Sequence, residues 1–478
     1  MRLGCRWTWV ALGLLAAGTP FLLFPGGWRT LALIVLPLIW IGNRLTTGHF
    51  IKRTPYDSVI LLLMAMLLVS LFATYDIAVS LPKIAGVILG VGVFYAFVYY
   101  GRHPLGWWSC LLVFLVLGLG TAVLGLLGTQ WGTKIPLLGP LIARLPIQLT
   151  GLPGAERGFN PNEVAGALLW VIPVFIALTG LAIVQARNWL AVRGRWRYRI
   201  MMGGLAAGTL FVTAVFLLTQ SRGGYIGLIV VGFGLLLIAL PSRRRILALG
   251  SLGLLVILVG GVAWRNGADS LLQMMFESNV IGDPASTINS FEARVEIWSR
   301  AIYAIQDFPF TGMGMNTFRE VVHVLYPLFL IPPDIDIAHA HNEFLQAALD
   351  LGIPGLIAFV ALYIGAFWML REIWQSASAA TLQPPASNLQ PPPSNLQPPT
   401  SNLQPPASSL QSPTSNLQLL TRPLVLGLGG GLFAHLVYGL TDAVALGAKP
   451  GILFWMLLGL IAALFEQTQL PRIRTSVS

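Results

Sequence analysis

Long apolar stretches recur along most of the chain, and they constrain its fold more than any other feature. A helix needs about 20 residues to cross the hydrocarbon core of a bilayer. None of the stretches alternates with a period of two, which disfavours an outer-membrane barrel, and helices satisfy their own backbone groups in lipid. The sequence therefore predicts an all-α fold, a polytopic transmembrane helical bundle with about 12 spans. The predicted spans are 7–24, 28–42, 56–74, 82–100, 107–128, 162–184, 201–220, 223–240, 246–264, 353–371, 423–441 and 451–466.

The charge content excludes a water-soluble enzyme, a coiled coil and a wholly disordered chain. Of the 478 residues, 55% are hydrophobic and 10% are charged, whereas a soluble domain carries about 25% charged residues. The two cysteines, Cys5 and Cys110, lie far apart and form neither a disulfide framework nor a CxxC zinc site. The net charge of +11 would suit either a nucleic acid or a membrane surface as the partner. The distribution of the charge along the chain distinguishes the two.

Basic residues gather in alternate loops when the N-terminus is placed in the cytoplasm. The cytoplasmic segments then hold 18 of the 29 basic residues and 3 of the 18 acidic ones. This bias follows the positive-inside rule, and the runs 187–199 and 243–245 carry most of it. We interpret these arginines as topological anchors beside anionic lipid. No nucleic-acid-binding motif accompanies them, so we expect membrane lipids and no nucleic acid as partners.

The spans divide the chain into five segments. Residues 1–264 form the first nine spans, 265–352 a large extracytoplasmic loop, 353–371 the tenth span, 372–422 a cytoplasmic linker, and 423–478 the last two spans with a basic tail. The large loop is too long to be a simple connection. It carries 4 basic and 11 acidic residues, and its net charge of −7 still allows a few arginines in a pocket.

The large loop contains an amphipathic pattern, so we expect it to carry short helices. The apolar positions at helical spacing are Phe291, Val295, Trp298, Ile302 and Ile305. Asn289 suits the N-cap of this helix with Glu292 three residues on, and Pro309 follows its end. We expect the helix to lie along the outer membrane surface. A second outer segment, 129–161, is rich in Gly and Pro and predicts an irregular or re-entrant loop that contains Lys134.

The linker contains a tandem heptapeptide repeat over residues 382–416, with units such as LQPPASN and LQPPTSN. Its prolines prevent a continuous helix. We expect a disordered, partly polyproline-II spacer on the cytoplasmic side. A proline-rich ligand for another domain is the alternative interpretation.

A few ionisable residues stand where chemistry is feasible. Arg222 follows Ser221 between two spans and either snorkels to the interface or presents a planar fork to a phosphate. His339 and His341 form an H-x-H pair that suits a metal, a structural hydrogen bond or a general base. His435 and Asp442, seven residues apart in one predicted span, should share a face. They mark either a polar site or proton path or a helix-packing contact.

Four motifs together resemble a known family. They are Gly158-Phe159-Asn160-Pro161-Asn162, Ser221-Arg222-Gly223, Arg294-x₃-Trp298 with Gly312-x-Gly314-x₃-Phe318, and His341-Asn342 followed after nine residues by Gly352 and after two more by Gly355. This set resembles the O-antigen ligase family, whose shared domain also occurs in O-antigen polymerases. The resemblance is good over about residues 55–371 and looser in the last two spans, and the proline-rich repeat has no counterpart in the family.

The resemblance implies a metal-independent glycosyltransferase without a cofactor. It would sit in the bacterial cytoplasmic (inner) membrane with its active site facing outward, and move a glycan from a polyprenyl-pyrophosphate carrier to an acceptor hydroxyl. The acceptor would be a lipid, another glycan or a protein. The resemblance implies that Arg222 and Arg294 hold the pyrophosphate while its charge develops and that His341 takes the acceptor's proton. The further substrate-binding residues that it implies are Asn342, Asn162, Arg157 and Arg319.

Two other functions remain open. An O-antigen or exopolysaccharide polymerase of the same family would use the same donor with a different acceptor. A membrane transporter is the alternative from another class, with His435 and Asp442 on an ion path. The two halves of the chain show no internal repeat of the kind common in transporters, and the polar candidates gather at one membrane face. Both observations favour the enzyme.

Overall fold

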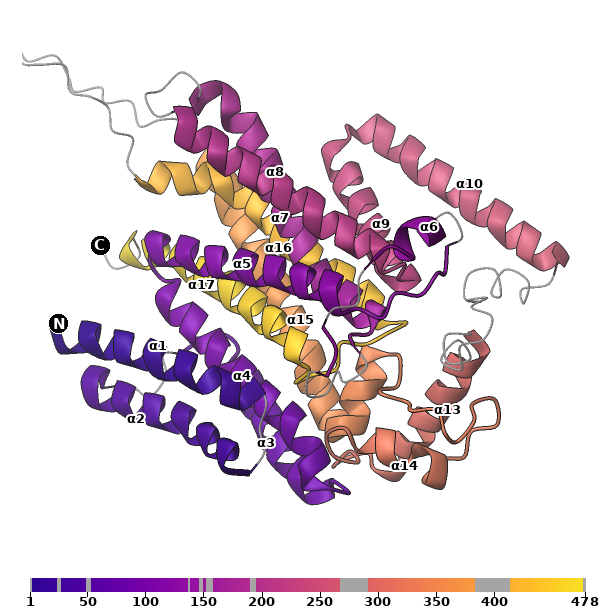
Figure 1. The fold of residues 1–478 in the computed structure, drawn as a ribbon. Coiled ribbons are helices and arrows are strands. Elements are labelled where there is room, and N and C mark those ends of the chain that lie inside the picture. Colours follow the sequence, from indigo (N-terminus) through magenta and orange to yellow (C-terminus); the bar gives the residue numbers. More distant parts are fainter. Residues whose placement is uncertain are drawn as a thin grey trace, which may run out of the picture.

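The described part of the chain is built from helices, as the sequence predicted (Figure 1). The computed structural model describes residues 2–23, 27–48, 53–135, 138–145, 149–151, 158–189, 195–266, 291–382 and 413–475. Within these ranges the backbone forms no strand, and one isolated bridge joins Thr129 to Phe159. Asn289, Arg157 and the repeat residues 383–412 lie outside the described residues.

Helices make up most of the described residues. They are α1 (Arg2–Leu23), η1 (Gly27–Ile34), α2 (Val35–Thr47), α3 (Asp57–Ala73), α4 (Ile77–Tyr100), α5 (Pro104–Gly128), α6 (Gly139–Ile142), α7 (Pro161–Trp189), α8 (Arg195–Leu218), α9 (Arg222–Ala239), α10 (Ser242–Asn266), α13 (Phe291–Asp307), α14 (Thr317–Leu325), α15 (Glu343–Leu382), α16 (Pro413–Gly439), η3 (Lys449–Gly451) and α17 (Ile452–Thr475).

Seven of the described helices are long and apolar enough to cross a membrane. They are α4, α5, α7, α8, α9, α15 and α17, and they coincide with seven of the twelve predicted spans. The predicted spans 28–42 and 56–74 correspond to shorter apolar helices. The remaining three are helical as α1, α10 and α16. The chain is therefore an integral membrane protein with seven candidate spans, and a count of twelve stays a prediction.

Helix α16 lies at the centre of the bundle, packed against α7, α9 and α15 (Figure 1). Its sequence over residues 427–431 is GLGGG, which leaves little bulk between the helices. A methyl group on Gly431 would meet the carbonyl oxygen of Trp170 in α7 at 2.6 Å. Small residues let helix backbones approach closely in membranes. The C-terminal end of α16 is thereby held beside the N-terminal end of α7.

A second, smaller hydrophobic core holds α13 and α14 against the first part of α15. In Figure 1 these helices lie together at one end of the bundle, and we call them the outer layer. The core of the outer layer includes Ala293, Ile297, Ala301, Phe318 and Leu349.

The apolar residues predicted to share one face of α13 are only partly buried in the core of the outer layer. The helix forms over Phe291–Asp307 as expected, but Val295 and Ile302 remain 43% and 45% exposed. The buried face instead carries Ala293 and Ala301. Helices separate by less where short side chains meet, so α13 turns its alanines and Ile297 towards the core and leaves Val295 and Ile302 outside it.

Gly352 connects the outer layer to the bundle. Its φ of 70° interrupts α15, a conformation that glycine adopts without cost. A methyl group there would meet the carbonyl oxygen of Phe310 at 2.5 Å. Nearby, the N–H of Met313 donates to the carbonyl of Leu349 at 2.7 Å. This close crossing fixes the short helix 343–351, and with it the segment that carries the histidine pair.

Candidate active site

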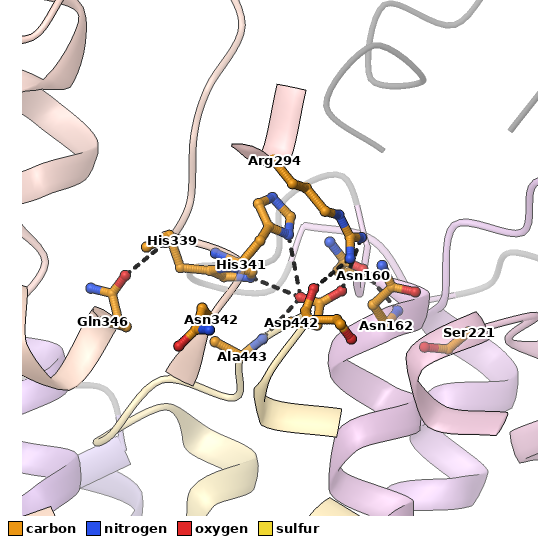
Figure 2. A network of polar contacts seen from close by, with 12 residues as sticks. Asn160, Asn162, Ser221, Arg294, His339, His341, Asn342, Gln346, Asp442 and Ala443 are labelled. Carbon is orange, nitrogen blue, oxygen red and sulfur yellow. Dashed lines mark hydrogen bonds and ion pairs between the residues drawn. The ribbon is translucent and has the colours of Figure 1, made fainter. Parts of the chain in front are cut away.

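Asp442 lies where three distant parts of the chain meet (Figure 2). Its side chain is buried. Nη2 of Arg294, from α13, lies 3.4 Å from Oδ2 of Asp442. Nδ1 of His341 and Nε2 of His339, from the segment before α15, lie 3.4 Å and 3.8 Å from Oδ1. A buried carboxylate with one cation and two imidazoles around it is a candidate site for proton transfer.

The sequence placed His435 and Asp442 on one face of one span, and this was wrong. α16 ends at Gly439, and the N–H groups of Thr441 and Asp442 both donate to the carbonyl of Tyr438 at 3.0 Å. This turn directs Asp442 towards Arg294, whereas His435 stays inside the bundle and stacks on Trp170. Hydropathy misses such a helix end because the residues on either side of it are equally apolar.

The backbone of His341 is held in an uncommon conformation. Its φ is 47°, which costs free energy in a non-glycine residue and is typical of functional sites. The N–H of His341 donates to Nδ1 of His339 at 3.2 Å, and its carbonyl accepts from Nε1 of Trp298 at 3.3 Å. The contact between Nδ1 and Asp442 favours a proton on that nitrogen, so the other ring nitrogen, Nε2, carries the lone pair. The polar contact of the ring with the described residues is that of Nδ1 with Asp442, and none joins Nε2 to them.

The electrostatics of the site keep Asp442 ionised. Burial alone would raise the pKa of its carboxyl group, but the hydrogen bond from His341 and the positive charge of Arg294 outweigh burial and lower the pKa well below its usual range. An ionised Asp442 stabilises the positive charge that His341 acquires when it accepts a proton. The same geometry is the working arrangement of a His–Asp pair in acyl-transfer enzymes.

His339, His341 and Asp442 also have to be tested as metal ligands, because one ligand atom from each lies within 4.8 Å of the others. Three protein ligands are enough for a catalytic metal. However, Nδ1 of His339 accepts the N–H of His341, so the proton of the neutral ring sits on Nε2, the atom that faces Asp442. Burial and the charge of His341 lower the pKa of His339 to about 3. A metal at Asp442 needs a lone pair on Nε2, so the arrangement fits proton transfer better than metal binding.

Arg294 is buried and its guanidinium is largely engaged. Nη1 donates to the carbonyl of Thr441, and Nη2 pairs with Asp442. Nε is buried without a partner among the described residues. Arg294 therefore ties the turn after α16 to α13 and orients the carboxylate of Asp442.

Arg222 begins α9 next to the same turn. Ser221 caps the helix, with its hydroxyl accepting the N–H of Gly224 at 3.4 Å. A methyl group on Gly223 would lie 2.6 Å from Oγ1 of Thr441, so the start of α9 abuts the residue that precedes Asp442. The charge of Arg294 acts on Arg222. The Ser-Arg-Gly motif thus contributes to the site by bringing a cation and a helix N-terminus close to the carboxylate.

Asn162 lies on the α7 side of the site. It is buried, and its N–H donates to Oδ1 of Asn160 at 2.8 Å, which caps α7. Its side-chain Oδ1 faces Nζ of Lys134 at 3.4 Å, and its carbonyl accepts the hydroxyl of Tyr438. The sequence did not predict that Lys134 and Asp442 lie together at this site. The capping Asn160-Pro161-Asn162 motif was the one signal that pointed to this corner.

Two predicted substrate-binding residues have structural partners. Asn342 caps α15, since its Oδ1 accepts the N–H groups of Phe344 and Leu345, while its Nδ2 donates to Leu440. Arg319 pairs through both arms of its fork with Asp336 on the exposed surface of the outer layer. Arg157 lies outside the described residues.

Comparison with known proteins bears on the same region. The family model described as O-antigen ligase matches residues 207–360. A Haemophilus influenzae protein, itself uncharacterised, is 26% identical over 157 residues, which cover 31% of this chain. The aligned part spans only 38% of that relative's length.

The matched region contains Arg222, Arg294 and His341, three of the residues whose motifs predicted this family. It ends before Asp442, and it begins after Asn162. The resemblance to O-antigen ligases is therefore confirmed over residues 207–360, and the apolar helices make the chain an integral membrane protein.

Proposed function

We propose that this protein is a metal-independent glycosyltransferase that moves a glycan from a polyprenyl-pyrophosphate carrier to an acceptor hydroxyl. One observation carries the proposal. Nδ1 of His341 faces the carboxylate of Asp442 at 3.4 Å, while Nε2, the other ring nitrogen, makes no polar contact with the described residues. Cations from Arg294 and Arg222 flank this pair, as a diphosphate leaving group requires.

The reaction is one displacement at the anomeric carbon of the carrier-linked sugar. The acceptor oxygen forms the new C–O bond while its proton passes to Nε2 of His341. The bond between the anomeric carbon and the phosphate oxygen breaks, and the polyprenyl pyrophosphate leaves with the electron pair. Asp442 stays ionised and stabilises the imidazolium until the proton returns to water.

The two arginines divide the electrostatic work. Arg222 lies at the first turn of α9, where the helix dipole also favours an anion, so it is the stronger candidate for direct contact with the diphosphate. Arg294 has its outer nitrogens committed to Thr441 and Asp442. It contributes its charge to the subsite and acts on the reaction mainly by orienting Asp442.

This function places the site on the outer face of the cytoplasmic membrane, where a finished lipid-linked glycan meets its acceptor. Residues 265–352 would then be extracytoplasmic and 372–422 cytoplasmic, in keeping with the distribution of arginines. Substrate binding by Asn342, Asn162, Arg157 and Arg319 is part of the same proposal. For Asn342 and Arg319 it requires the substrate to compete with the contacts described above.

Transfer in detergent tests the proposal. The purified full-length protein is mixed with a polyprenyl-pyrophosphate glycan, candidate acceptors and a metal chelator. We expect transfer, and we expect His341→Ala to lower its rate by about 10²–10⁴-fold, the usual effect of losing a general base. Lipid and glycan acceptors tried in parallel separate ligase from polymerase activity.

The control is His323→Ala. His323 also belongs to the outer layer, but its Nε2 contacts the carbonyl of Ile335, away from Asp442. This variant should transfer at the wild-type rate. Full activity of His341→Ala would contradict the role of His341 as the general base. Movement of the intact carrier across a vesicle membrane without glycan transfer would favour the transporter.

A further inference from the structure

A buried glutamine fastens an outer loop beside the candidate active site. Gln220 lies directly before the Ser221-Arg222 motif, is 1% exposed and has a φ of 52°. Its side-chain Oε1 accepts the N–H groups of Lys134 and Ile135 at 2.8 Å and 2.6 Å, and its Nε2 donates to the carbonyl of Gly132 at 2.7 Å. One amide thereby makes three hydrogen bonds to the backbone of a loop that lies about 90 residues away in the sequence.

The loop is also fixed at its base. The N–H of Gln130 donates to the carbonyl of Phe159 at 3.1 Å, and the N–H of Phe159 donates to Gly128 at 2.7 Å. Between this pairing and the clamp made by Gln220, the backbone of residues 128–135 has little freedom. A glutamine held in a strained left-handed conformation, with its whole amide spent on a loop, indicates that the position of this loop matters.

The three hydrogen bonds from Gln220, which we call the clamp, hold the loop so that the side chain of Lys134 lies at the candidate site. Nζ lies 3.4 Å from Oδ1 of Asn162, and it is close enough to Asp442, Arg294 and Arg222 for their charges to act on it. From α7 the contact is the neutral amide of Asn162. Among the described residues, the charged groups that act on Lys134 are thus one carboxylate and two guanidinium groups. Together with Lys134 they carry a net charge of +2.

Arg294 and Asp442 are buried, and Lys134 and Arg222 are half-buried. The surplus of positive charge in this group favours an anion. A diphosphate esterified at both ends carries one negative charge on each phosphate, so its charge balances that of the group. The asparagine beside Nζ is a weak partner for an ammonium ion, since it offers one neutral oxygen for three donors. The other two N–H groups of Lys134 are therefore available to phosphate oxygens.

We infer that Lys134 is a third cation of the diphosphate subsite, and that Gln220 is the positioning residue that holds it there. This inference rests on the proposed function and adds to it a ligand-binding residue and its support, both outside residues 158–162 and 294–355 that carry the other motifs. It also gives Gln220, adjacent to the Ser-Arg-Gly motif, a role that the motif itself does not include.

The pKa of Lys134 supplies the readout. Burial, and then the charges of Arg294 and Arg222, lower the pKa against the opposing effect of Asp442, to about 8. Lys134 is therefore a cation at neutral pH and loses its charge as the pH rises through about 8. An arginine at this position stays charged throughout that range. Binding of an anion should weaken above this pH in the wild type and should not weaken in Lys134→Arg.

Binding of undecaprenyl pyrophosphate whose free end is esterified with a simple alkyl group tests the inference in detergent micelles without knowledge of the glycan. With both ends esterified, each phosphate keeps one negative charge over the pH range used. The full-length protein is titrated at about pH 7 and about pH 9.5, on either side of the transition. We expect the wild-type dissociation constant to rise about 10- to 100-fold between the two, as for loss of a charge-assisted hydrogen bond. Lys134→Arg should bind equally at both, and Lys134→Gln should bind weakly at both.

The outcomes separate the two proposals. If Lys134→Gln binds like the wild type at both pH values, the role of Lys134 is wrong while the proposed function stands. If the wild type binds the carrier at neither pH, the proposed function fails and this inference fails with it. Retention of a pH-dependent loss in Lys134→Arg would assign the titration to another group.

Gln220→Gly tests the clamp, because glycine accepts the left-handed backbone and removes only the amide. Carrier binding at neutral pH should weaken, and the double variant with Lys134→Gln should bind no more weakly than Lys134→Gln alone, since the two residues act through one another. Asn316→Gly is the matched control at another left-handed residue and should bind normally. Additive losses in the double variant would overturn the positioning role of Gln220.

Discussion

Two histidine–carboxylate pairs lie within a few residues of one another, and they differ in what surrounds them. Nδ1 of His341 lies 3.4 Å from Asp442 where the outer layer meets the bundle. Nε2 of His435 lies 3.1 Å from Oε2 of Glu343 inside the bundle. Both pairs are buried and both join parts of the chain that are distant in sequence, so residue type and burial alone do not distinguish them.

The difference lies in the second nitrogen of each ring. In His435, Nδ1 faces the carbonyl of Gly166 at 2.9 Å, and the ring stacks on Trp170 with centroids 3.9 Å apart. Since a carbonyl can only accept, Nδ1 carries a proton, and the contact with Glu343 needs one further proton that sits on either partner. Both nitrogens of His435 thus face an oxygen inside the bundle, whereas no polar contact joins Nε2 of His341 to the described residues.

A buried histidine is therefore a candidate general base when a neighbouring carboxylate orients one ring nitrogen and the other ring nitrogen stays accessible to a substrate. We call His435 and Glu343 the inner pair, and His341 and Asp442 the outer pair. The inner pair ties α16 to α7 and α15, the three helices whose ends lie next to Asp442, Asn162 and His341. The outer pair uses that rigid support. Substitutions at the outer pair should therefore change the rate of transfer, and substitutions at the inner pair should change stability.

The largest effect is expected for Asp442→Asn. The amide cannot stabilise the imidazolium and presents a donor to Nδ1, which favours the wrong tautomer of His341. We expect the turnover number to fall about 10²–10⁴-fold with little change in carrier affinity. Transfer kinetics and carrier titration on the same preparation measure the two quantities. A rise in the Michaelis constant with unchanged turnover would instead make Asp442 a binding residue.

The next largest effect is expected on stability, from a substitution that breaks the inner pair. Glu343→Leu leaves His435 with an unpaired buried nitrogen, which should cost about 3–5 kcal/mol of unfolding free energy. Glu343→Gln keeps a hydrogen bond and should cost much less. Thermal unfolding in detergent of the two variants, with transfer measured on the folded fraction, checks this. A wild-type melting temperature for Glu343→Leu would show that the inner pair does not support the helix ends.

A smaller effect is expected for Arg294→Lys. This substitution tests a difference between the two pairs, because Arg294 contacts the carboxylate of the outer pair. One ammonium cannot reach both the carbonyl of Thr441 and the carboxylate of Asp442 in the way a planar fork does. We expect transfer to fall about tenfold, the effect of one charge-assisted hydrogen bond. Kinetics of Arg294→Lys beside Arg294→Ala measure it. Equal losses in the two variants would mean that the fork geometry, and not the charge, is what the site needs.

The sequence predicted the helical fold, and it singled out His341, Arg222 and Arg294, which the structure brings to one region. Both predictions depend on local information, and the roles of the three residues stay predictions. Apolar length shows the spans, and short motifs mark the three residues. It failed where a position depends on distant packing. The turn after Gly439 that separates Asp442 from His435 is set by contacts with α7 and α13. The loop position of Lys134 is set by Gln220, which no spacing pattern connects to it.

The smallest effect is expected at His339, and it decides between proton transfer and a metal. The Nδ1 atom of His339 accepts the N–H of His341, two residues on, and this bond holds the uncommon backbone conformation of His341. An asparagine offers Oδ1 in the same place, since its side chain commonly bonds the backbone two residues on. His339→Asn therefore keeps the support and removes Nε2, whereas His339→Ala removes both.

If His339 only supports its neighbour, His339→Asn should transfer within about threefold of the wild type, the size of an ordinary surface substitution, and His339→Ala should lose about tenfold, as expected for one hydrogen bond. Both should be insensitive to chelator. If His339 instead held a metal through Nε2, asparagine and alanine would be equally damaging, and chelator would reduce the wild type to their level. The ranking of these two variants with and without chelator thus tests whether the lone pair that matters in this cluster belongs to His341.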